Sequence, residues 1–247
     1  MVELDTEHIL ILVIVVFFLY HLSSCRCFDS GFRVGGALDD TCRLLKKNKC
    51  KGNEKCVDKI FNNCDARGAD LTEANLSGAD LRDVNLTGTI LIKANLSGAN
   101  LSDVRLRYTD LKNADLTGAN LYQADLGDTI LKNADLTGAD LTEADLTGAN
   151  LYKADLRGAD LKDANLYKVD LRDADLKNAN LTGANLTDAV LENANLTGAD
   201  LTGTDLTSAY LRKANLSGAI LKDSNLTNTH FNYAILNEAD LTNSSSS

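Results

Sequence analysis

Four cysteines near the N-terminus, Cys42, Cys50, Cys56 and Cys64, are the residues best suited to covalent or metal chemistry. Seven, five and seven residues lie between them. On two antiparallel helices joined near residues 51–53, this symmetry puts Cys42 opposite Cys64 and Cys50 opposite Cys56. The arrangement favours two nested disulfides, with buried free thiols as the next alternative. Zinc is less favoured because its ligand pairs usually stand about two to four residues apart.

No arrangement of side chains suited to catalysis is visible in the sequence. The three histidines, His8, His21 and His230, are far apart along the chain. There is no glycine-rich phosphate loop, and the serines have no neighbouring base. We therefore predict no catalytic residue, no metal site and no cofactor, and a protein that is not an enzyme.

The composition argues against three other classes of protein. Hydrophobic residues make up 44% of the 247 residues, which is too many for a disordered chain. Yet there is no Pro or Trp, only one Met, and aromatic residues reach 5%, which is unlike an ordinary globular core. The 35 Asp and Glu residues exceed the 25 Lys and Arg residues and give a net charge of −10. This balance argues against direct nucleic-acid binding through a broad basic surface.

A five-residue repeat determines how any functional side chain is positioned. From Leu71 to Leu241 every fifth residue is Leu, apart from Phe231, and the residue two before each Leu is small, mostly Ala. A helix advances about 100° per residue and would spread these leucines around its circumference. A strand would place successive leucines on opposite faces. The chain must therefore turn once per repeat, with Ala and Leu inside a narrow coil.

Glycine indicates how many repeats close one coil. Positions 78, 98, 118, 138, 158, 198 and 218 are all Gly, and only Asn178 interrupts the series. Because stacked residues share requirements such as a positive φ, this spacing predicts twenty residues, and hence four sides, per coil. With coils about 4.8 Å apart, the repeats would form a rod of roughly 42 Å.

The pattern A-[DN]-L-[STKR]-x, as in Ala74–Gly78 and Ala139–Glu143, resembles that of the pentapeptide repeat family over about 175 residues. The resemblance implies an all-β fold, a right-handed quadrilateral β-helix with Leu and the small residue inside. Family members include proteins that bind DNA gyrase by imitating duplex DNA. The family has no shared catalytic residues that could be carried over to this chain.

The sequence divides into four segments. Residues 1–24 form a hydrophobic membrane anchor or signal segment, 25–64 a Cys-containing linker and helical cap, 65–243 the repeat β-helix, and 244–247 a serine tail. We expect a hydrophobic helix in the first segment. A short helical hairpin is expected in the second, because the open end of a solenoid needs covering. Val57, Ile60 and Phe61 would cover the first coil.

The apolar run Ile9–Tyr20 predicts membrane contact through residues 9–24. Acidic residues precede this run and basic residues follow it, which favours an uncleaved anchor over a secretory signal. The repeats would then lie on the cytosolic side or within a virion, and an exported, periplasmic protein is the alternative. The segment Leu22–Cys25 resembles a lipobox, so Cys25 is a candidate lipidation site. A cytosolic location conflicts with disulfides unless a specialised compartment oxidises the cysteines.

Sorting the outward residues by their place in the coil predicts two contrasting sides. One side mixes apolar groups with cations, which is typical of a protein contact. Its candidate contact residues are Ile90, Ile92, Ile130, Tyr152, Val190, Tyr210, Lys112, Lys132 and Arg172. A second side is acidic, with candidate residues Asp80, Asp83, Asp103, Asp140, Glu143, Asp160 and Asp163. The alternative is that both patterns are solvated surface that keeps the repeats soluble.

Two other features of the repeats bear on binding. A third side stacks Asp115, Asp135, Asp155 and Asp175 in one column. Like charges about 4.8 Å apart in water repel by roughly 0.9 kcal/mol per pair, so a structural requirement is not expected to select this column. The C-terminal end is rich in apolar residues, which predicts docking or an end-to-end homodimer there. The candidates at this end are Phe231, Tyr233 and Ile235.

The sequence therefore predicts a non-enzymatic scaffold, a membrane-tethered rigid rod that binds protein partners through its flat sides or its C-terminal end. A minor structural component of a virion or membrane assembly is one version, because Cys25–Gly36 resembles the post-anchor segments of virion proteins of large DNA viruses. The alternatives are an exported or lipid-anchored bacterial repeat protein and an acidic DNA mimic that inhibits a topoisomerase.

Overall fold

The computed structural model describes residues 66–82 and 84–246. The chain divides into two units, Met1–Ala37 and Leu38–Ser247, and the described residues belong to the second. The predictions for the membrane segment, the helical cap, the four paired cysteines, Cys25 and Asp83 lie outside the described residues. Residues 66–82 and 84–246 contain no helix that is long and apolar enough to cross a bilayer.

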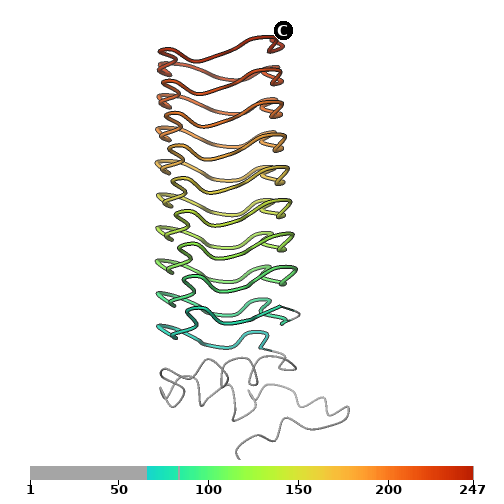
Figure 1. Cartoon of the computed structure of the whole chain (residues 1–247), viewed down its shortest axis with the longest axis vertical. Coiled ribbons are helices and arrows are strands. Elements are labelled where there is room, and N and C mark those ends of the chain that lie inside the picture. The colour runs from blue at the N-terminus through green and yellow to red at the C-terminus, as the bar shows by residue number, and fades with distance from the viewer. Residues whose placement is uncertain (1–65, 83, 247) are drawn as a thin grey trace, which may run out of the picture. The chain divides into compact units, whose positions relative to one another are not determined.

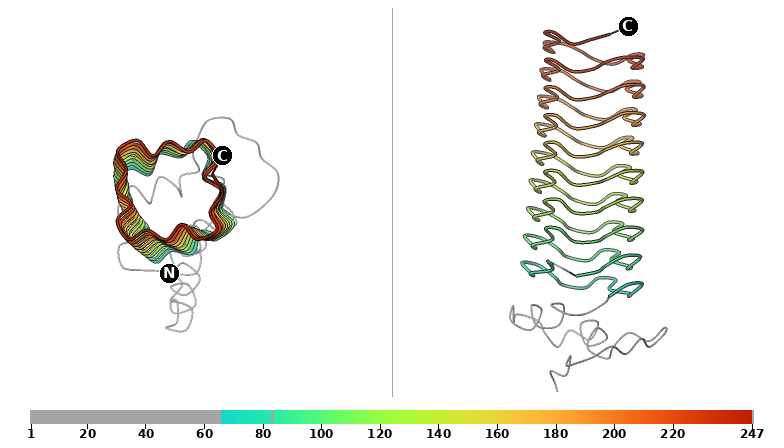
Figure 2. Two further views of the ribbon diagram at one scale, coloured as in Figure 1. Left: turned by 90° about the horizontal axis from the view of Figure 1, so that it is seen from above. Right: turned by 90° about the vertical axis from the view of Figure 1, so that its right-hand side faces the viewer.

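The described residues form a square-sided coil that advances one layer every twenty residues (Figures 1 and 2). Parallel bridges join each layer to the next, from Asp70↔Ile90 to Asn225↔Ser245. The described part contains no helix and no extended strand, because each pentapeptide contributes a single bridge residue. The sequence-based prediction of four sides per coil is thus confirmed by the pairing register.

Each pentapeptide is one turn followed by one bridge, as residues 91–95 illustrate. The backbone N–H of Ala94 donates to the carbonyl of Leu91 at 3.0 Å and closes the turn. Leu91 donates upward to Asp110 and Lys93 donates upward to Lys112, at 2.7 and 2.9 Å. Asn95 donates downward to Ala74 at 2.9 Å. Four of the five N–H groups of such a repeat therefore donate to backbone carbonyls.

The second turn residue has a positive φ on all four sides of the coil. The glycines at every twentieth position are therefore not the only residues with this conformation. Every fifth described residue from Gly68 to Asn243 has a φ between 53° and 70°, and most of these residues are not Gly. A side chain at Gly98 would meet no atom within 4 Å, so Gly there relieves only the backbone strain. Glycine correctly indicated the twenty-residue layer, but the strain itself occurs at every turn.

The core is a continuous column of leucines packed against small residues. Each Leu from Leu91 to Leu221 is at most 1% exposed, and most of the small residues two positions earlier are equally buried. Each buried Leu contributes about 1.5–3 kcal/mol against the entropy of ordering the chain. Where Thr replaces Ala, its hydroxyl still finds a partner, since Thr109 Oγ1 donates to the Leu86 carbonyl at 2.9 Å.

Candidate interaction faces

The coil presents four flat faces, which we name by the leucines behind them and the character of their outward residues. The mixed face lies outside Leu91, the small-residue face outside Leu96, the acidic face outside Leu101 and the amide face outside Leu106, each continuing every twenty residues. Because the chain visits them in this order around a square coil, the mixed face is opposite the acidic face (Figure 2).

The structure brings all nine predicted contact residues onto the mixed face. Ile90, Ile130, Val190 and Tyr210 belong to one column of bridge residues. Three of them are exposed, by 38% for Ile90, 41% for Ile130 and 44% for Tyr210. Apolar side chains therefore recur along a flat wall of the coil, and their role as a protein contact stays a prediction.

Tyr152 is the centre of a cation cluster on the mixed face. The Nζ atoms of Lys132 and Lys153 lie 5.0 and 5.2 Å from the centroid of its ring. Cζ of Arg172, in the next layer, lies 5.9 Å from the same centroid. These distances suit cation–π contacts, which hold the cations beside an aromatic surface. The cluster can therefore bind a partner that offers carboxylates next to an apolar group.

The cations of the mixed face differ in how their charge is compensated. Arg172 donates to both carboxylate oxygens of Asp170, at 2.8 and 2.7 Å, and holds the pKa of Asp170 below its usual value. Toward one end of the face, Lys93 lies 3.2 Å from a carboxylate oxygen of Glu73. Among the described residues, no ion pair involves Lys112, Lys132 or Lys153. The described lysines of this face without an ion pair are thus Lys112, Lys132 and Lys153 in its middle layers and Lys213 toward its C-terminal end.

The acidic face carries the opposite imbalance. Its Asp80 pairs with Arg82 at 2.6 Å, which lowers the pKa of Asp80. Glu143 accepts a hydrogen bond from Gln123 Nε2 at 2.6 Å. The described carboxylates of this face without an ion pair are Asp103, Asp140, Glu143, Asp160, Asp163, Asp200, Asp223 and Asp240.

The negative charge of this face acts on a tyrosine. Desolvation, followed by the charges of Glu143, Asp103 and Asp140, raises the pKa of Tyr122. Tyr122 lies between these carboxylates on the same wall of the coil. Carboxylates therefore outnumber cations on the acidic face, although Arg82, Lys162 and Lys222 also lie on it.

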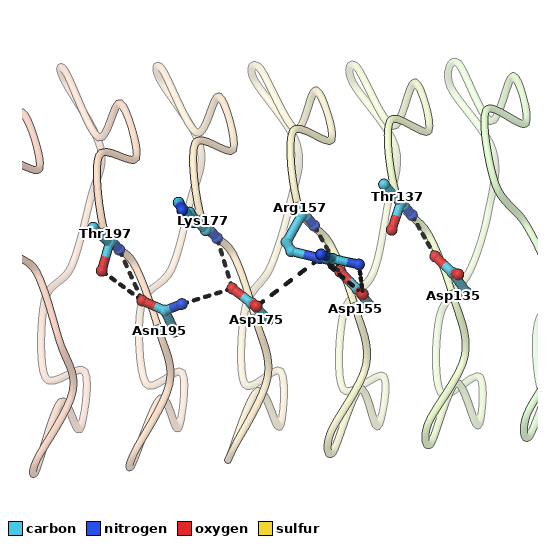
Figure 3. Close-up of polar contacts among 8 residues, drawn as sticks. All are labelled: Asp135, Thr137, Asp155, Arg157, Asp175, Lys177, Asn195 and Thr197. Atoms are coloured by element: carbon cyan, nitrogen blue, oxygen red, sulfur yellow. Dashed lines mark hydrogen bonds and ion pairs between the residues drawn. The ribbon is translucent and has the colours of Figure 1, made fainter.

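The stacked aspartates of the small-residue face have a structural role that the charge argument missed (Figure 3). Asp135, Asp155 and Asp175 each accept a hydrogen bond from the backbone N–H two residues later, at 2.9 to 3.1 Å. Arg157 bonds to Asp155 and lies 4.0 Å from Asp175, so it links two layers. The expectation that structure would not select this column is wrong, because each carboxylate satisfies a turn.

The three candidates at the C-terminal end do not form one patch. Phe231 takes the Leu position and packs partly buried against the core. Tyr233 is 82% exposed at a turn of the mixed face, whereas Ile235, 46% exposed, is a bridge residue of the small-residue face. End-to-end pairing through these residues stays a prediction.

On the amide face, sequence reasoning missed a contact between two layers. Arg107 reaches Asp125 at 3.4 Å and Asp128 at 3.1 Å, and its guanidinium crosses over Gly127. The available signal was a glycine at the first turn position, twenty residues after an arginine. Within residues 66–82 and 84–246, no group of three or more His, Cys, Asp or Glu side chains could hold a metal ion.

Comparison with known proteins identifies the family. The model for pentapeptide repeats matches in eight copies over residues 60–88, 79–118, 94–133, 134–173, 170–207 and 209–245. No curated protein matches the chain significantly.

Among solved structures, HetL, a pentapeptide repeat protein involved in heterocyst differentiation regulation in the cyanobacterium Nostoc, is 33% identical with a TM-score of 0.54. That match covers 81% of this chain and 94% of HetL. Rfr23, a pentapeptide repeat protein from the cyanobacterium Cyanothece, is 40% identical over 44% of this chain and 64% of its own, with a TM-score of 0.25. The chain belongs to the pentapeptide repeat family, whose members fold as right-handed quadrilateral β-helices and are generally non-enzymatic structural or interaction proteins.

Proposed function

We propose that this chain is a non-enzymatic scaffold that binds a protein partner through its mixed face. The Tyr152 cluster carries the proposal, because it places an aromatic ring beside Lys132 and Lys153, two cations that form no ion pair among the described residues. Exposed Ile90 and Ile130 continue the same wall. A flat, preorganised surface with aromatic, aliphatic and cationic groups has the composition that protein interfaces favour.

The amide face supplies a matched control for testing the contact. Tyr167 occupies the equivalent turn position there, with Lys168 Nζ 4.8 Å from its ring centroid. A photo-crosslinking residue would replace Tyr152 in one variant of the full chain and Tyr167 in another, both in native cells. We expect a discrete cross-linked protein from position 152 and none from 167. Equal cross-linking from both positions, or none from 152, would contradict the proposal.

A membrane-tethered form of this scaffold is part of the proposal. The support is the apolar run Ile9–Tyr20 followed by basic residues, which fits an anchor with the repeats on the cytosolic side or within a virion. Membrane fractionation with protease protection tests both tether and sidedness. Recovery of the full chain in the soluble fraction would contradict the tether but would not affect the proposed mixed-face contact.

The acidic face supports a second candidate function, imitation of duplex DNA toward a basic groove. Its carboxylates without ion pairs recur in most layers, which stand about 4.8 Å apart, and they form a row of negative charge as the phosphates do, whose rise is about 3.4 Å per strand along the DNA axis. A supercoiling assay with a topoisomerase tests this function directly. Inhibition that disappears when Glu143 and Asp163 become Lys would support it, and no inhibition would dismiss it.

A further inference from the structure

The unpaired cations of the mixed face and the unpaired carboxylates of the acidic face lie in the same layers of the coil. Residues 131–150 form one layer that carries Lys132 on the mixed face and Glu143 on the acidic face. Residues 151–170 form the next layer, with Lys153 and Asp163 on the corresponding faces. In these two layers the cations of the mixed face outnumber its carboxylates, whereas on the acidic face the carboxylates outnumber the single cation, Lys162.

The repeat spacing makes these two walls complementary between molecules as well as within one. Every layer is joined to the next by the same parallel bridge pattern, so two rods lying side by side have the same spacing of layers. When one rod is shifted sideways without sliding along its axis, Lys132 of the first copy faces the layer of Glu143 in the second. Lys153 faces the layer of Asp163 in the same way.

We propose that the mixed face of one copy binds the acidic face of a second copy, side by side and with the layers in register. The inference rests on the proposed function of the mixed face and names its partner as another molecule of this chain. The exposed apolar residues of the mixed face, such as Ile130, would be covered by the turn residues of the neighbouring acidic face.

The geometry determines what kind of assembly results. The two surfaces are different and lie on opposite walls, so each bound copy still offers a free mixed face and a free acidic face. Such head-to-tail contacts do not close, and they produce rows of rods instead of a fixed dimer. Exposed ion pairs are individually weak and are screened by salt. The rows should therefore form at low ionic strength and dissolve as salt is raised.

Charge reversal on each face separates this assembly from other kinds of association. The first variant, Lys132→Glu with Lys153→Glu, makes the mixed face acidic. The second, Glu143→Lys with Asp163→Lys, makes the acidic face basic, at turn positions where Lys153 and Lys168 show that Lys fits the positive φ. A control variant, Lys168→Glu with Lys177→Glu, makes the same change in net charge as the first variant, but on the other two faces.

The measurement is sedimentation velocity of the purified full chain, in mild detergent, at about 20 mM and about 0.5 M salt. We expect the native chain and the control to form larger species at low salt only. Each reversal variant alone should remain monomeric, with its apparent dissociation constant raised at least about tenfold. An equal mixture of the two variants should associate again, because each now offers what the other lacks.

Two results would overturn the proposal. One is a native chain that stays monomeric at low salt, and the other is association that persists in both reversal variants or ignores salt, as association through residues 9–24 would. Cross-linking from position 152 separates the two levels of inference. If position 152 cross-links to a different protein and the chain is monomeric at low salt, the proposed function is supported and self-association is contradicted.

Discussion

The guanidinium of Arg107 occupies the space that a side chain on Gly127 would need. A Cβ built on Gly127 would lie 2.5 Å from Nη1 and 2.7 Å from Cζ of Arg107. Gly127 has no positive φ, unlike the glycines at the second turn position. Its lack of a side chain therefore makes room for Arg107 and does not relieve backbone strain. Arg107 uses that space to reach the carboxylates of Asp125 and Asp128.

Replacing Gly127 by Thr should displace Arg107 and slightly lower the denaturation midpoint. Thr is an ordinary residue at this turn position, for example Thr147, so the turn itself should tolerate it. The measurement is a double-mutant cycle in which Arg107→Thr is combined with Gly127→Thr. We expect the penalty of the glycine substitution to vanish once Arg107 is gone. The same penalty in both backgrounds would contradict the contact.

Truncating a leucine in the middle of the core should cost much more than truncating one in the last layer. Leu151 is fully buried, so Leu151→Ala should lower the free energy of unfolding by about 2–5 kcal/mol. Leu236 packs against the core only partly buried, and Leu236→Ala should cost clearly less. Chemical denaturation followed by circular dichroism compares the two. Equal losses would argue against a core continuous through the middle layers.

Removing the buried hydroxyl of Thr109 should cost about 1 kcal/mol. Thr109→Val keeps the shape of the side chain but loses the hydrogen bond to the Leu86 carbonyl. That carbonyl still accepts from the N–H of Thr89 at 3.0 Å, which limits the loss. Thr109→Ser retains the hydroxyl and is the control for the missing bond. A Val variant as stable as the native chain would show that this hydroxyl contributes nothing.

The contribution of the aspartate column to stability should come more from the acceptor oxygen of each side chain than from its charge. Asp155→Asn keeps an acceptor for the N–H of Arg157, and Asn195 already fills the equivalent place two layers away. We expect Asp155→Asn, which loses only the ion pair with Arg157, to cost less unfolding free energy than Asp155→Ala, which also loses the acceptor and should cost about 1 kcal/mol or more. The comparison is made by chemical denaturation. Equal losses in the two variants would assign the effect to the charge.

The rod should lose stability in acid. Arg157 and Arg172 donate hydrogen bonds that hold the pKa values of Asp155 and Asp170 below their usual range. The unfolded chain, with aspartate pKa values near about 3.9, then binds more protons than the folded chain in acid, so stability rises with pH in that window. It should be fully present above about pH 5 and fall as the pH drops through the folded pKa values.

Denaturation at neutral pH and at about pH 3 measures the acid effect. The double variant Asp155→Asn with Asp170→Asn should show a smaller difference between the two conditions than the native chain. The reference variant is Asn195→Ala, which changes a column residue that does not titrate. An unchanged pH dependence in the double variant would show that these two carboxylates are not responsible.

The coil could be predicted from the sequence because one residue type, Leu, recurs at one spacing along its core. Leu at every fifth position admits neither helix nor flat strand, and the Gly78 column indicated the twenty-residue layer. The sequence was not sufficient for Asp135 and Asp155, because a Coulomb argument between stacked carboxylates ignores the backbone N–H that each one accepts. Hydrogen bonds to turn donors outweigh a repulsion that water weakens.

The side-chain contacts between layers were also beyond the sequence argument. Stacking by twenty places Lys132, Tyr152 and Arg172 in one column, which the sequence does give. Whether Arg172 turns toward Asp170 or toward a partner depends on side-chain directions that composition does not encode. For the same reason, the compensated and uncompensated cations of the mixed face could be told apart only in the structure.

Because one layer takes twenty residues, the coil can change its length without altering its faces only in steps of twenty residues. Deleting one pentapeptide would leave every downstream Leu inside, yet it would rotate all later residues by a quarter turn onto the neighbouring wall. Beyond the deletion, each wall of the coil would then carry the cations and carboxylates that belong to the neighbouring face. Only insertions or deletions of twenty residues preserve the continuity of all four surfaces. Such proteins can grow or shrink without redesign of their exterior only in whole layers.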